Sequence, residues 1–122
     1  MDNTAVTCEN LTLLAGIAAA CSEIQRTLSE HLASTSSAQY KADIEKDIVT
    51  LENLKLITAA IRADIESGTL GASSELLLRI AANDFNKKLA QIPEKKTLRA
   101  KVSADLKEVH RNILKMSPVN HL

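Results

Sequence analysis

The chain has 122 residues, 45% hydrophobic and 25% charged, and this length predicts a single domain over residues 1–122. Tyr40 and Phe85 are its only aromatic residues and only three residues are glycine, which argues against a β-sandwich or barrel and favours helices. Fifteen basic residues balance fifteen acidic ones, so no net field attracts nucleic acid or an anionic membrane.

Apolar residues recur at three- and four-residue steps over residues 8–32 and predict the first amphipathic helix. Within it, residues 11–21 resemble the apolar part of a signal peptide. Residues 1–10 contain Asp2 and Glu9 but no Lys or Arg, and a signal peptide needs a basic segment there. The run is also shorter than the roughly 20 residues that span a membrane. We therefore expect a cytoplasmic protein with no membrane span.

The second predicted helix starts near Ser37, where Ser36 and Gln39 have the spacing of a capping box, and ends where Gly68 can adopt a left-handed conformation. One face carries an apolar stripe of Tyr40, Ile44, Ile48, Leu51, Leu54, Thr58, Ile61 and Ile65. The far side carries a second apolar strip of Val49, Leu56, Ala60 and Ala63. A helix with two apolar faces is either enclosed in a bundle or available to a partner.

A third helix is predicted after the loop 68–71, with Ser73 as its cap and Glu75 in its first turn. Its stripe is Leu77, Leu78, Ala81, Phe85, Leu89 and Ile92. Pro93 then either kinks a continuous helix or begins a new one, and we prefer a tight turn because a helix over residues 73–116 is long for a globular domain.

The last segment, residues 93–116, has a narrow apolar seam and a basic outer face. The seam consists of Leu98, Val102, Leu106, Val109, Ile113 and Met116, within an arc of about 80°. From Val102 the steps are those of a coiled coil, although Arg99 occupies the preceding core position. The opposite face carries Lys96, Lys107, Arg111 and Lys115, and residues 117–122 are expected to form a loose tail.

These segments predict an all-α fold, an antiparallel bundle of four amphipathic helices, or three with a kink at Pro93. Residues 1–71 hold five basic and ten acidic side chains, whereas residues 72–122 hold ten and five. The halves therefore carry −5 and +5 and attract each other, within the fold or between subunits.

The sequence gives no support for catalysis, a cofactor or a bound metal. None of the three histidines follows a glutamate by three residues, as a di-iron bundle requires, and none is four residues from another. Phosphate-binding loops and serine-hydrolase motifs are absent. Asp43 and Asp47 lie one turn apart on what we expect to be a solvated face. Cys21 falls on the first apolar stripe, too far from Cys8 for a disulfide.

The sequence favours a non-enzymatic helical protein–protein interaction module with an adaptor or chaperone-like role. Such a module binds a helix of a partner or of a second copy of the same chain. The predicted partner-binding residues are Val49, Leu56, Ala60, Ala63, Val102, Leu106, Val109 and Ile113. The alternative is a small-ligand or lipid carrier whose cavity is lined by Ile17, Ile24, Leu51 and Phe85. Two further alternatives are a phosphorelay protein using His110 and a nucleic-acid-binding protein using the basic face.

Overall fold

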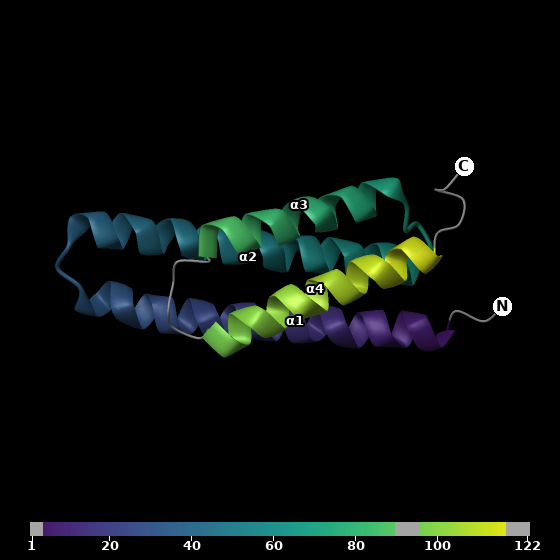
Figure 1. Ribbon diagram of the computed structural model, residues 1–122, viewed down its shortest axis with the longest axis horizontal. Helices are drawn as coiled ribbons and strands as arrows, with labels where there is room; N and C mark the ends of the chain where they lie inside the picture. Colours follow the sequence, from purple (N-terminus) through teal and green to yellow (C-terminus); the bar gives the residue numbers. More distant parts are fainter. Residues whose placement is uncertain (1–3, 90–95, 117–122) are drawn as a thin grey trace.

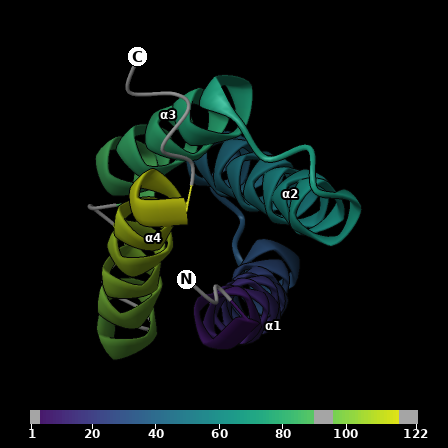
Figure 2. The same cartoon turned by 90° about the vertical axis from the view of Figure 1, so that its right-hand side faces the viewer.

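The computed structural model describes residues 4–89 and 96–116, which form four helices running alternately in opposite directions (Figure 1). The helices are α1 (Thr4–Ser34), α2 (Ala38–Ser67), α3 (Ala72–Leu89) and α4 (Lys96–Met116). Each packs against the next along the chain, and α4 returns to α1, so that the four occupy the corners of a bundle (Figure 2). The predicted all-α antiparallel bundle is confirmed with α3 and α4 as separate helices. Pro93 and the predicted tail 117–122 lie outside the described residues.

The ends of α2 depend on one serine and one glycine. The Ser37 side chain accepts a hydrogen bond from the backbone N–H of Tyr40 at 3.2 Å. Gly68 has φ 74°, the left-handed conformation that closes a helix without steric strain. The predicted capping box of Ser36 and Gln39 is wrong, because Ser37 is the cap and the Gln39 amide donates to the residue four positions later.

The turn between α2 and α3 is fixed by a buried hydroxyl group. Ser74 is buried, and its Oγ donates to Oδ2 of Asp64 at 2.8 Å and accepts a bond from the backbone N–H of Gly71 at 3.4 Å. The helix begins at Ala72, so the prediction of Ser73 as its cap is wrong. The hydroxyl that organises this turn belongs to the next serine.

The core follows the predicted stripes of all four helices. Its buried members are Leu14, Ile17, Ala20, Cys21, Ile24, Leu28, Ile44, Leu51, Leu54, Ile61, Leu78, Ala81, Phe85, Val102, Leu106, Val109 and Ile113. Two predicted members are exposed instead. Tyr40 lies in the first turn of α2, where α1 and α2 extend beyond α3 and α4 (Figure 1). Leu77 is turned aside because Leu78, Ala81 and Phe85 form the inner face of α3.

Two amide side chains join α1 to α4 inside the core. Nδ2 of Asn112 donates to Oδ1 of Asn10 at 3.0 Å, and both residues are buried. Buried amides are costly without partners, so this bond favours the one register in which α4 brings the pair together. A second polar link joins α1 to α2, where Nε2 of Gln25 donates to the backbone oxygen of Ile48 at 3.1 Å.

Candidate interaction surface

The α2 strip, defined as Val49, Leu56, Ala60 and Ala63, lies on the surface. Val49 is 57% exposed and Leu56 is 61% exposed, and the two alanines are exposed as well. These positions face away from Leu51, Leu54 and Ile61, which point into the core. The surplus apolar face predicted for this helix is therefore confirmed, and none of the described helices covers it.

The α4 seam, unlike the α2 strip, is buried. Val102, Leu106, Val109 and Ile113 are all at most 1% exposed and belong to the intramolecular core. Their heptad spacing fits pairing with helices of the same chain, chiefly α1 and α3. The structure thus separates the two halves of the predicted partner-binding set: the α2 strip is open to solvent, whereas the seam is enclosed.

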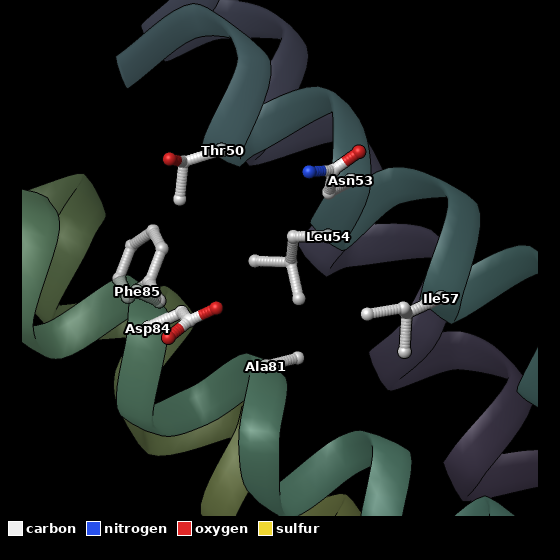
Figure 3. Close-up of a pocket in the computed structure, with 7 residues that line it drawn as sticks. All are labelled: Thr50, Asn53, Leu54, Ile57, Ala81, Asp84 and Phe85. Carbon is white, nitrogen blue, oxygen red and sulfur yellow. The ribbon is translucent and has the colours of Figure 1, made fainter. Parts of the chain in front are cut away.

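Helix α3 contributes exposed apolar residues that sequence reasoning missed. Leu76, Leu77 and Ile80 are each between 42% and 47% exposed. Asp84, one turn after Ile80, lines a hollow together with residues of α2, which places this side of α3 next to α2 (Figure 3). Exposed apolar residues therefore occur on α3 as well as on the α2 strip, and the polar side chains of Asn53 and Asp84 lie at the hollow between the two helices. A signal was present: three large apolar residues, 76–78, follow one another, and a helix can turn only part of such a run inward.

The hollow between α2 and α3 is small. It measures about 30 Å³ and is lined by Thr50, Asn53, Leu54, Ile57, Ala81, Asp84 and Phe85 (Figure 3). That volume suits about one water molecule, whereas a small-molecule site typically has about 300–1,000 Å³. Of the residues expected to line a carrier's cavity, Ile17, Ile24 and Leu51 are closed within the core and Phe85 borders this hollow.

His110 is held by a carboxylate from α3. Its Nε2 lies 2.6 Å from Oε1 of Glu75, and the two side chains are 30% and 21% exposed. The hydrogen bond from His110 lowers the pKa of Glu75, and the positive charge of Arg79 lowers it further. One of the two imidazole nitrogens of His110 is thus engaged in joining α3 to α4.

The basic face of α4 is interrupted by acidic partners. Lys96, Lys107 and Arg111 are exposed as expected, while the side chain of Lys115 lies outside the described residues. Arg111 donates to Glu108 at 2.6 Å, and the neighbouring Lys101 donates to Asp105 at 2.7 Å. These bonds offset part of the positive charge that phosphate groups would require.

The pair Asp43 and Asp47 is not the fully solvated pair expected. Asp47 is half-buried, and desolvation, with a smaller contribution from the Asp43 carboxylate, raises its pKa to about 6. No group of three or more potential metal ligands occurs within residues 4–89 and 96–116. Cys21 is buried and Cys8 exposed, and both are free thiols.

Comparison with known proteins gives no assignment: no family model, no curated protein and no solved structure matches this chain. Within the described part of the chain, none of the helices is both long enough and apolar enough to cross a membrane. The surface chemistry of the bundle is therefore the basis for a functional proposal.

Proposed function

We propose that this chain is a non-enzymatic helical interaction module, acting as an adaptor or chaperone-like protein in the cytoplasm, that binds an apolar helix through the outer face of α2. The observation that carries the proposal is the exposure of Val49 and Leu56, in a bundle whose other helices turn their main stripes inward. Burying apolar surface is worth about 25 cal/mol per Å². A helix laid along the α2 strip removes that surface from water.

Exposed apolar residues on α3 add to the surface that is available for binding. Leu77 and Ile80 share a side of α3 with Asp84, which borders the hollow between α3 and α2. Helix-in-groove recognition uses apolar anchors spaced at three, four and seven residues.

The other proposed functions have less structural support. A carrier needs space in the core, and Ile17, Ile24 and Leu51 are closed there. A phosphorelay protein needs an accessible imidazole nitrogen, and one of the two in the part-buried ring of His110, Nε2, contacts Glu75. Each remains testable: native mass spectrometry for a co-purified lipid, and a phosphoryl-acceptance assay of His110→Gln.

The experiment that tests the proposal compares two double variants. Val49→Asp with Leu56→Asp places charges in the α2 strip, while Lys107→Glu with Arg111→Glu alters an exposed face of α4. All four positions are exposed, and Arg111→Glu also removes the surface pair with Glu108, so each substitution is expected to change stability by at most about 1 kcal/mol, which circular dichroism and urea unfolding verify. Binding to a partner helix or to a second copy is expected to be lost in the first variant and kept in the second. Unchanged binding in a folded first variant would contradict the proposal.

A further inference from the structure

The contact between His110 and Glu75 leaves one imidazole nitrogen available for chemistry. We propose that His110 accepts a phosphoryl group at Nδ1 from a phosphoramidate, a donor whose phosphorus is bonded to nitrogen, and that Glu75 is the positioning residue for this transfer. Acceptance is a stoichiometric modification and not turnover. It goes beyond helix binding through α2 and does not depend on it, because both residues belong to the contact between α3 and α4.

The hydrogen bond to Glu75 fixes the position of the ring proton. Nε2 of His110 lies 2.6 Å from Oε1 of Glu75. This bond lowers the pKa of Glu75, so the side chain is a carboxylate at neutral pH and can only accept a hydrogen bond. Nε2 must therefore carry the proton. In a neutral imidazole the other nitrogen is then unprotonated, so Nδ1 has a lone pair with which to attack phosphorus.

Nδ1 is open to solvent, and its direction is fixed. The side chain of His110 is 30% exposed. Within residues 4–89 and 96–116 the ring forms one hydrogen bond, through Nε2, and Nδ1 is not among the buried nitrogen atoms that lack a partner. Figure 1 shows the start of α3 and the end of α4 at the same end of the bundle, which is where Glu75 meets the ring. The imidazole is thus held between two helices and does not rotate freely on the surface of α4.

The transfer balances with these two side chains and the donor alone. The lone pair of Nδ1 forms a new P–N bond to the ring while the P–N bond of the donor breaks. The donor nitrogen, protonated before the step, keeps the electron pair of the broken bond and leaves as ammonia or an amine. The ring retains its proton at Nε2 and becomes positively charged. The Glu75 carboxylate stabilises this imidazolium, as the orienting carboxylate does in a catalytic triad.

Positive charge beside the ring favours a phosphoryl group, which carries up to about two negative charges at neutral pH. Arg79 lies one turn after Glu75, and its Nε is 3.9 Å from the same Oε1 that His110 contacts. Helix α3 begins at Ala72, so the positive end of its dipole lies within one turn of Glu75. Both features offset the repulsion between the Glu75 carboxylate and the incoming group.

Potassium phosphoramidate is the probe that tests acceptance. Mass spectrometry and phosphorus NMR, under alkaline conditions that preserve P–N bonds, locate the product on the intact folded chain. One phosphoryl group is expected at Nδ1 of His110, at a rate at least about tenfold above that of His31 in the same chain, because only the first ring is held by a carboxylate from another helix. In urea His110 is expected to lose this advantage. His110→Gln is expected to remove the product.

Glu75→Gln tests the positioning role. An amide can donate to Nε2 as well as accept from it and carries no charge, so phosphorylation of His110 is expected to be at least about tenfold slower. Glu75→Asp keeps a carboxylate and is expected to recover part of the rate. Glu66→Gln is the matched control, since it removes another carboxylate that is paired with an arginine, and it leaves the rate unchanged. Circular dichroism verifies that each variant is folded.

Nitrogen NMR of the imidazole reports the tautomer directly. The proton is expected on Nε2 in the wild-type chain, and a mixture of tautomers in Glu75→Gln. A proton on Nδ1 of the folded wild-type chain, a product at Nε2, or equal rates at His110 and His31 would each overturn the proposal. An unchanged rate in a folded Glu75→Gln would overturn the role of Glu75. None of these results bears on helix binding, which the substitutions in the α2 strip test separately.

Discussion

The buried amide pair between α1 and α4 gives the sharpest prediction about how the α4 seam is kept inside the molecule. Asn112 donates to Asn10 at 3.0 Å, and the two residues are 4% and 0% exposed. Replacing either with leucine, which has a similar branched shape, removes this bond and deprives the remaining buried amide of one partner. We expect each single variant to be less stable and the double variant to recover much of the loss.

The magnitude follows from the burial of the pair. A buried polar group that loses its partner costs about 1–3 kcal/mol, so each single variant is expected to lose about 2 kcal/mol. Replacing both members removes both buried amides, which leaves a cost of about 1 kcal/mol from the larger leucine side chains. The coupling energy between positions 10 and 112 is then about 3 kcal/mol, at the upper end for residues in contact.

Urea unfolding followed by circular dichroism measures all three variants. With an m-value near 1.5 kcal/mol per M, each single variant shifts the midpoint down by about 1.3 M and the double variant by less than 1 M. Asn112→Leu is also expected to expose the seam more often, with faster hydrogen exchange at Val109. Additive losses, with no recovery in the double variant, would refute the assignment of this bond as the link that fixes α4 on α1.

Three further predictions follow from the titratable groups. Burial raises the pKa of Asp47 above its unfolded value, so the contribution of this residue to stability falls as the pH rises from about 4 to about 6. Asp47→Asn is therefore expected to stabilise the fold by about 0.5–1 kcal/mol at pH 7, a value reduced for solvent screening, and not to stabilise it at pH 4. An equal gain at both pH values in urea unfolding would contradict this. The hydrogen bond from His110 lowers the pKa of Glu75, so this bond stabilises the fold above pH 4.5, the ordinary pKa of a glutamate, and the stabilisation is lost in acid. His110→Ala is expected to lower the free energy of unfolding by about 1 kcal/mol at pH 7 and to make the loss of stability below pH 5 less steep. An unchanged acid unfolding curve would exclude that role. Burial raises the pKa of Cys21 to about 12, so iodoacetamide is expected to label Cys8 alone in the folded chain and both thiols in urea. Mass spectrometry of the labelled chain measures this. Rapid labelling of Cys21 without denaturant would argue against a closed core.

Periodicity predicted the parts of this fold that are determined locally. The four helices, the left-handed Gly68 and the buried Cys21 all follow from spacing and residue type. The prediction for Tyr40 was wrong because that residue lies where α1 and α2 extend past their neighbours. Local periodicity indicates which residues share a face, but the length of the adjacent helices decides whether that face is covered.

The polar contacts between helices were beyond the reach of the pattern. Asn10 and Asn112 are 102 positions apart, and His110 and Glu75 are 35 apart, so their pairing depends on how the helices are arranged. One signal was available in the sequence. Asn112 directly precedes Ile113, a residue of the apolar seam, and an amide buried beside the seam requires a hydrogen-bond partner. The α2 strip, by contrast, could be predicted from the sequence, because its apolar residues face away from the stripe that fills the core.

A photo-cross-linking amino acid placed at position 56 tests the central claim most directly, with the same amino acid at position 107 on α4 as the control. If the outer face of α2 is the interaction surface, irradiation yields a defined adduct from position 56, with a second copy or with another helical protein, and Val49→Asp abolishes it. Position 107 yields no such adduct. The absence of any adduct from position 56, or the same adducts from both positions, would contradict the claim.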